Sequence, residues 1–194
     1  MRELRIHGRG GQGAVIASKV LAVALFREDR WVQSFPAFGV ERRGAPVTAF
    51  LRLDDEPIRL RCEIREPDDL IILDSTLVDA IDVTAGLKEG GGILINTDRP
   101  PSAYPHLTDR FEVATVDASS VATARGIGSK SQPIVNTAIL GAFATWSGVV
   151  SLDSVCAAID EEVPSRTEEN KAAAREAAEV VRTLEDADAE VAHV

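Results

Sequence analysis

Hydrophobic positions along this chain alternate between short runs typical of strands and longer periodic stretches typical of helices. The strands are predicted at residues 4–6, 31–35, 47–53, 70–74, 93–96 and 111–116. The helices are predicted at residues 14–28, 77–85, 134–146 and 169–184, with a short one opening at Ser151. This order favours an α/β fold of Rossmann-like type, with a mostly parallel sheet and helices on both faces.

Two strand patterns refine this picture. Residues 54–57 have turn chemistry, so residues 58–61 are expected to pair back on residues 47–53 as an early β-hairpin. Residues 70–73 form a continuous apolar run, as expected of a parallel strand buried on both faces. Asp74 ends that strand, and two roles stay open for it: the edge of a ligand site or the cap of the following helix.

The second half of the chain supplies the remaining helices. Residues 134–146 are apolar almost all round, so this helix must be buried. Ser165 and Glu168 have the spacing of a capping box and are expected to start the last helix. We expect residues 1–184 to form a single domain, followed by an acidic, frayed tail at residues 185–194.

Composition narrows the function classes. No run of about 18 apolar residues and no signal-peptide pattern occurs, so we expect a cytoplasmic protein without a membrane partner. The net charge of −10 disfavours nucleic acid. Residues 1–66 nevertheless hold 12 Lys or Arg against 9 Asp or Glu, whereas the remainder hold 9 against 22. The first part therefore favours an anionic ligand or an acidic partner surface, with uneven surface solvation as the alternative.

The cysteines and histidines do not predict a metal centre. Cys62 and Cys156 are the two cysteines, and they lie far apart without a C-x-x-C partner. This chain alone therefore supplies neither a disulfide framework nor the ligands of an iron–sulfur cluster. The three histidines show no metal-ligand spacing. We expect no metal and no tightly bound cofactor in this chain.

A glycine-rich segment at residues 7–13 is the strongest candidate for a binding site. It joins a predicted strand to a predicted helix, where unpaired N–H groups and the helix dipole favour anions. Its glycines fit the G-x-G-x-x-G spacing of a dinucleotide site, but residues 31–35 lack the acid that would bind a ribose. A tight turn that binds nothing is the alternative. The predicted binding residues here are Gly8, Arg9, Gly10, Gly11, Gln12 and Gly13.

Several segments together resemble one family. In order along the chain, residues 7–13, 38–47 and 55–58 resemble the gamma subunit of 2-oxoacid:ferredoxin oxidoreductases, most closely the pyruvate and branched-chain type. Residues 67–74, 90–96 and 133–141 continue the resemblance, which covers roughly residues 3–180. The specific signal is the combination of Gly-Arg-Gly-Gly-Gln-Gly with a later Glu-Arg-Arg-Gly-Ala-Pro.

The resemblance implies a multisubunit enzyme that oxidatively decarboxylates pyruvate or a related 2-oxoacid to acyl-CoA and CO2. Such complexes use thiamine diphosphate, Mg and iron–sulfur clusters carried by alpha, beta and delta-type subunits, and they reduce ferredoxin. The gamma chain is then a non-autonomous subunit without catalytic residues of its own. Which 2-oxoacid and which electron acceptor are used depends on the companion chains.

For this chain the resemblance implies two overlapping roles. Coenzyme A binding involves the glycine segment with Arg42, Arg43 and Asn136, because guanidinium groups suit phosphate. Contact with companion subunits involves Phe38, Glu41, Arg42, Arg43 and Gly44. Ion pairs of Glu41 with the arginines across an interface are the alternative to phosphate binding, and an ordinary N-cap is the alternative for Asn136. A stand-alone Rossmann-type nucleotide-binding protein and a non-binding assembly scaffold remain as competing functions.

Overall fold

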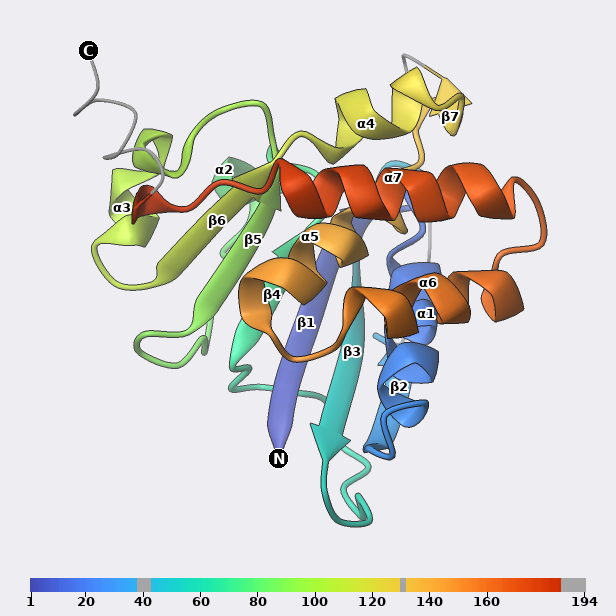
Figure 1. Ribbon diagram of the computed structural model, residues 1–194. Coiled ribbons are helices and arrows are strands. Elements are labelled where there is room, and N and C mark those ends of the chain that lie inside the picture. Colours follow the sequence, from blue (N-terminus) through green and yellow to red (C-terminus); the bar gives the residue numbers. More distant parts are fainter. Residues whose placement is uncertain (38–42, 130–131, 186–194) are drawn as a thin grey trace.

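A six-stranded sheet forms the centre of the molecule (Figure 1). The structure is a computed structural model that describes residues 1–37, 43–129 and 132–185. The strands lie in the order β2-β3-β1-β4-β5-β6. Their bounds are β1 Arg2–Arg9, β2 Trp31–Pro36, β3 Pro46–Asp54, β4 Asp69–Ile72, β5 Gly92–Asn96 and β6 Glu112–Val116.

The four strands β1, β4, β5 and β6 run parallel. All residues of β4 and β5 are buried, because helices cover this part of the sheet on both sides. A continuous apolar run such as residues 70–73 is therefore the expected sequence for such a strand. The predicted mostly parallel α/β architecture is confirmed.

The early hairpin forms between different segments from those predicted. β2 pairs antiparallel with β3, with Trp31 opposite Asp54 and Pro36 opposite Ala49. Residues 58–61 were expected to be the partner of β3, but they form no strand. Their place beside β3 is taken by β2 on one side and by the antiparallel neighbour β1 on the other. With both edges of β3 occupied, no backbone positions remain for residues 58–61.

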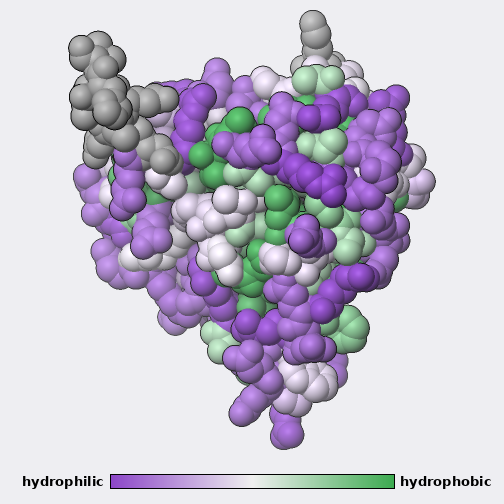
Figure 2. Space-filling view, in the orientation of Figure 1, coloured by the Kyte–Doolittle hydropathy of each residue, from purple (hydrophilic) through white to green (hydrophobic). Residues whose placement is uncertain are grey.

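A layer of long helices covers one face of the sheet (Figure 1). These helices are α1 Ala14–Phe26, α4 Ala118–Ala124, α5 Ala138–Ser147, α6 Leu152–Glu162 and α7 Thr167–Glu179. Every residue of α5 from Ala138 to Ala144 is buried, as the all-round apolar pattern predicts. At Gly141 an added Cβ would lie 1.9 Å from the carbonyl oxygen of Ala174, so α5 and α7 pack in close contact. The outer surface over α7 is mainly hydrophilic (Figure 2).

Shorter elements cover the opposite face of β4, β5 and β6. They are α2 Leu77–Ala80, the 3-10 helix η1 Pro101–Ala103 and α3 Pro105–Thr108. The core on this face contains Leu77, Val83, Leu87 and Tyr104, packed on the apolar side chains of β4 and β5. The helix predicted at residues 77–85 therefore ends early, because residues 83 and 87 reach the core through turns. A small two-stranded ribbon, β7 Gly128–Ser129 with β8 Gln132–Pro133, precedes α5.

Helix starts differ in how well the sequence predicted them. The Ser151 hydroxyl accepts from the N–H of Ser154 and caps α6, as expected. The capping box of Ser165 and Glu168 is wrong, because α7 begins at Thr167 after Arg166 in a left-handed conformation with φ 53°. Glu168 instead pairs with Lys171. The buried Asn170 side chain bonds the carbonyl oxygen of Arg166 at 2.8 Å and accepts from Thr137, which fixes this turn.

Past α7 the chain returns to the sheet. Arg182 and Thr115 exchange backbone hydrogen bonds of 2.8 and 2.9 Å, which adds a bridge to the outer edge of β6. The last helix is shorter than the predicted span of residues 169–184. Most of the expected acidic tail, residues 186–194, lies outside the described residues.

Candidate functional site

The glycine segment lies where β1, β3 and α1 meet. β1 continues through Gly8 to Arg9, so the strand is longer than predicted and the turn is shorter. Gly10 donates to the carbonyl oxygen of Ala45 at 2.9 Å, and Gly44 donates to that of Gly10 at 3.1 Å. These bonds attach the turn to the start of β3. Two segments that are distant in sequence thereby form one rigid loop pair.

Glycine is required at Gly13 for two reasons. It has φ 82° at the N-terminus of α1, in the left-handed region. A Cβ at this position would lie 2.6 Å from Nδ2 of Asn136. Gly11 has φ 100°, but a Cβ there would meet nothing within 4 Å. Gly13 therefore permits a close approach, whereas Gly11 only permits the turn.

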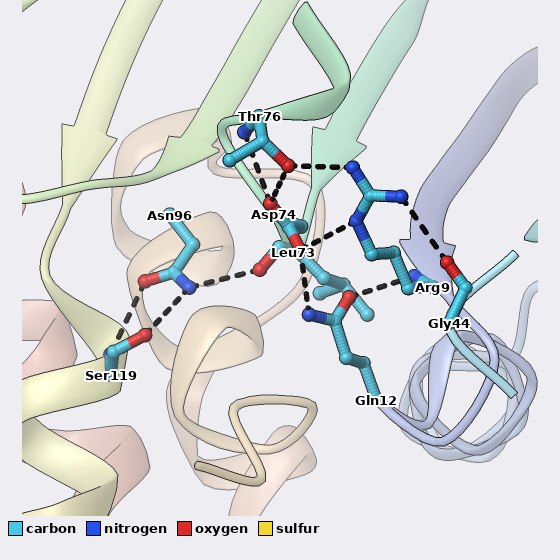
Figure 3. A network of polar contacts seen from close by, with 8 residues as sticks. All are labelled: Arg9, Gln12, Gly44, Leu73, Asp74, Thr76, Asn96 and Ser119. Carbon is cyan, nitrogen blue, oxygen red and sulfur yellow. Dashed lines mark hydrogen bonds and ion pairs between the residues drawn. The ribbon is translucent and has the colours of Figure 1, made fainter. Parts of the chain in front are cut away.

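Arg9 is held by its own chain (Figure 3). Its Nε lies 3.1 Å from Oδ2 of Asp74, and its two terminal nitrogens donate to Thr76 Oγ1 at 2.7 Å and to the carbonyl oxygen of Gly44 at 3.2 Å. The guanidinium thus joins the end of β1, the turn after β4 and the loop before β3. Its first role is to fix these three segments.

Gln12 completes the network around Asp74 (Figure 3). Its amide oxygen accepts from the backbone N–H of Arg9 at 2.7 Å, and its Nε2 donates to Asp74 at 2.9 Å. Burial alone would raise the pKa of Asp74, but hydrogen bonds from Thr76 and Gln12 and the charge of Arg9 outweigh it and lower the pKa. Asp74 also accepts from the backbone N–H of Thr76 at 3.0 Å. The expectation that Asp74 caps the following helix is wrong, because Thr76 is the N-cap residue of α2; Asp74 lines the polar groove described below.

A cleft of about 420 Å³ opens beside this loop. Arg9, Gly10, Gly11 and Gln12 form one wall with Arg43 and Gly44, and the ribbon of β7 and β8 forms the other. Arg43 donates to the side-chain oxygen of Gln132 at 2.8 Å across the cleft. Gln132 is neutral, and among the described residues no carboxylate pairs with Arg43. The arrangement offers an anion one cation beside the end of a helix.

A second, polar groove continues from the cleft along the carboxyl ends of β4, β5 and β6. It measures about 490 Å³ and shares Gln12 and Pro133 with the cleft. Asn96 lines it and is 7% exposed; its amide donates to the carbonyl oxygen of Leu73 and to Ser119 Oγ, each at 2.9 Å (Figure 3). Neither Asn96 nor Ser119 is among the site residues predicted from the sequence. Asn96 could have been predicted from its position at the carboxyl end of an apolar strand, because ligand crevices form at such ends.

The structure separates the predicted binding residues into groups. Arg9, Gly10, Gly11, Gln12 and Arg43 line the cleft. Gly8 instead packs inside the fold, where a Cβ would lie 3.1 Å from Leu73 Cδ1, and it does not line the cleft.

Asn136 also lies apart from the cleft. It is 4% exposed, packs on Gly13 and accepts from the N–H of Thr137 at 2.9 Å. Thr137, not Asn136, is the N-cap residue of α5, so the ordinary N-cap assignment is wrong. Phe38, Glu41 and Arg42, predicted for the interface, lie outside the described residues.

The position of β2 also bears on nucleotide binding. In a dinucleotide site the ribose-binding acid follows a strand that lies parallel beside the first strand. Here the neighbours of β1 are β4 and the antiparallel β3, and β2 is the edge strand beyond β3. The second strand, β2, therefore does not bring an acidic residue to the position where it would bind a ribose.

The described residues form neither a metal site nor a membrane-spanning helix. Within residues 1–37, 43–129 and 132–185, no three His, Cys, Asp or Glu side chains are grouped to hold a metal ion. In that same part of the chain, no helix has both the length and the apolar character needed to cross a membrane. Cys62 is exposed, Cys156 is buried, and both are free thiols.

Comparison with known proteins gives a consistent result. Residues 3–180 match the family described as pyruvate ferredoxin/flavodoxin oxidoreductase. The chain is 49% identical over 180 residues to the common gamma subunit of the pyruvate/ketoisovalerate oxidoreductases of Thermococcus kodakarensis, which covers 92% of this chain and 95% of that protein. It is 46% identical over 183 residues to the pyruvate synthase subunit PorC of Methanothermobacter marburgensis, covering 94% and 98%.

A solved structure agrees with these relatives. The crystal structure of the pyruvate oxidoreductase subunit PORC from Thermotoga maritima superposes with a TM-score of 0.80 at 33% identity. The superposition covers 93% of this chain and 97% of that one. The chain therefore belongs to the pyruvate ferredoxin/flavodoxin oxidoreductase family, as a gamma-type subunit of a multisubunit 2-oxoacid oxidoreductase.

Proposed function

We propose that this chain acts in the cytoplasm with alpha, beta and delta-type companions in a complex that converts pyruvate or a related 2-oxoacid to acyl-CoA and CO2. The companions hold thiamine diphosphate, Mg and the iron–sulfur clusters, and ferredoxin receives the electrons. The cysteine content supports this division, because a cluster takes about four Cys ligands and this chain has two cysteines in all. The gamma chain contributes binding surface and not reacting groups.

The cleft beside the glycine turn is the proposed contact for the phosphate groups of coenzyme A. The observation that carries this proposal is Arg43, a cation whose hydrogen-bond partner in the cleft is the neutral Gln132. Arg9 is different, because Asp74 already balances its charge. We therefore assign phosphate binding to Arg43 and the backbone N–H of Gly11, because the N–H of Gly10 already donates to Ala45. Arg9 is assigned the positioning of that backbone.

An assembly role for the same surface is the second candidate. It is supported by exposed apolar side chains near the turn: Val15 and Ile16 in the first turn of α1, and Ile134 at the cleft, are 37%, 49% and 41% exposed. Apolar side chains beside a polar loop are typical of a subunit contact. In this case the cleft would be an interface with Gly44, Arg43 and the predicted contacts Phe38, Glu41 and Arg42.

The test is the substitution Arg43→Ala in the assembled complex, purified without oxygen. Loss of one charged contact predicts a rise of about tenfold in KM for coenzyme A with kcat and subunit content unchanged. Arg59→Ala is the matched control, because Arg59 is exposed and does not line the cleft.

The outcomes separate the two candidates. An unchanged KM with weakened assembly would assign the surface to subunit contact. Failure of the chain to purify with thiamine-binding and cluster-bearing proteins from its native host would contradict the complex itself.

A further inference from the structure

The face of the sheet that lies opposite the long helices contains a groove that the proposed function does not use. On β1, Arg5 and His7 point to this face, away from Leu4 and Ile6, which pack under the long helices. The groove has a volume of about 420 Å³, and its lining includes residues 63–65 together with Ala85 and Gly86. These two segments touch, since a Cβ at Gly86 would lie 2.1 Å from the carbonyl oxygen of Arg65.

His7 is a buried imidazole with an unused nitrogen. It lines the groove and is 6% exposed. Its Nδ1 lies 3.4 Å from the Thr48 hydroxyl, whereas its Nε2 has no hydrogen-bond partner among the described residues. Burial, with a smaller contribution from the charge of Arg5, lowers the pKa of His7 to about 4. The ring is thus neutral near pH 7, and with the Thr48 hydroxyl donating to Nδ1 it carries its proton on Nε2.

Arg5 is a half-buried cation that forms no ion pair with the described residues. One terminal nitrogen donates to the carbonyl oxygens of Val83 and Ala85 at 3.0 and 2.7 Å, while Nε has no hydrogen-bond partner in this part of the chain. Among the described residues, no carboxylate lies within ion-pair distance of Arg5. Burial lowers the pKa of Arg5, and the more distant charge of Asp82 opposes this. An uncompensated charge of this kind costs free energy, which an anion in the groove would recover.

The unpartnered donors match one kind of ligand. Arg5 and His7 alternate with Ile6 on the same strand, so their Cα atoms are about 6.6 Å apart and both side chains reach the same groove. The groove also contains Arg65 and one acidic side chain, Glu63, which leaves a positive excess. We propose that this groove binds a carboxylate group, which lies against the ring of His7 and is attracted by the positive charges of Arg5 and Arg65.

A free small carboxylate and an acidic side chain of a companion subunit share this chemistry, so the experiment has two arms. In the first arm, the full chain is labelled with ¹⁵N-histidine, and its histidine NMR signals are followed. Sodium acetate, and then succinate, replaces chloride while ionic strength and pH are held constant. The chain has three histidines, so His7→Gln assigns its signal and the exposed His106 reports any general effect. A free-ligand site predicts a saturable shift of the His7 signal alone.

The second arm measures the affinity of the same chain for its purified companion subunits. If the carboxylate belongs to a companion, Arg65→Gln should weaken assembly by about threefold, the effect of one exposed ion pair. Arg59→Gln is the matched control, since Arg59 is an exposed arginine of the same segment that does not line the groove. In the first arm, Arg65→Gln should likewise weaken acetate binding by about threefold.

Each result decides the proposal. A saturable His7 shift that Arg65→Gln weakens supports a free carboxylate, and weakened assembly specific to Arg65→Gln supports an acidic side chain of a companion. No His7 shift with either probe, together with equal assembly of the two arginine variants, overturns the site. Neither arm measures coenzyme A binding or turnover. Failure of this proposal can therefore be distinguished from failure of the proposed coenzyme A contact at the glycine turn.

Discussion

The two basic sites of this subunit differ in how their polar groups are satisfied. At the glycine turn, Arg9, Gln12, Asp74 and Thr76 bond one another, and the network is closed within the chain. In the groove lined by Arg5 and His7, each of these residues has a buried nitrogen that is unpaired within residues 1–37, 43–129 and 132–185. A closed network holds backbone in place, whereas open buried donors indicate that a binding partner is missing. An arginine near a loop is therefore not by itself a ligand contact.

The largest expected effect concerns the rigidity of the turn. Gly13→Ala combines a left-handed φ with a Cβ 2.6 Å from Asn136, so we expect a loss of about 3 kcal/mol in the free energy of unfolding. Gly11→Ala, with φ 100° and open space around the Cβ, should cost about 1 kcal/mol. Urea unfolding of both variants measures the difference. Equal losses would show that the Asn136 contact yields at little cost.

The next effect tests the open site through pH. The pKa of His7 falls from 6.5 to about 4 on folding, so the unfolded chain binds the proton more tightly. Stability from this group is fully present above pH 6.5 and is lost as the pH falls toward about 4, by about 3 kcal/mol in all. His7→Gln should flatten this part of the stability curve, and the exposed His106→Gln should not. Urea unfolding across that pH range is the measurement, and parallel wild-type and His7→Gln curves would contradict the burial argument.

A smaller effect is expected from opening the closed network. Asp74→Asn removes the charge that balances Arg9 while keeping the shape of the side chain, and we expect a loss of about 2 kcal/mol. Because folding lowers the pKa of Asp74, the wild-type advantage should be present above the ordinary value of 3.8 and disappear as the pH falls through the folded value. Asp98→Asn in the same polar groove is the control, since Asp98 is exposed. Equal stabilities of the two variants would show that Arg9 is held adequately by Thr76 and Gly44.

The sequence predicted those parts of the fold that depend on local pattern. The apolar run at residues 70–73 became β4 with its continuation, and the all-round apolar stretch became the buried α5. Pairing between strands was harder. Residues 58–61 alternate apolar and charged side chains and therefore look like a strand, but hydrogen bonding depends on which edges are free. Both edges of β3 are taken by segments that precede it in the chain.

The site shows the same division between local and distant information. The glycines and Arg9 were found because strand, turn and helix follow one another directly in the sequence. The contact of Asn136 with Gly13 joins residues far apart along the chain, and spacing alone cannot show whether a polar side chain faces a ligand or a neighbouring glycine. The groove at Arg5 and His7 was missed for a similar reason. Their alternation with Leu4 and Ile6 gives the face of the strand but not what covers it.

The placement of β1 between β3 and β4 has a consequence for synthesis of the protein. β1 is translated before both of its neighbours, which end at Asp54 and Ile72. Until the ribosome has released both segments, the N–H and C=O groups of β1 have no partners, and Leu4 and Ile6 are not covered. The core around Leu4 and Ile6 also includes residues of α5 and α7, which lie in the last third of the chain. Strand pairing can therefore be complete well before this core closes, and closure waits for the C-terminal helices.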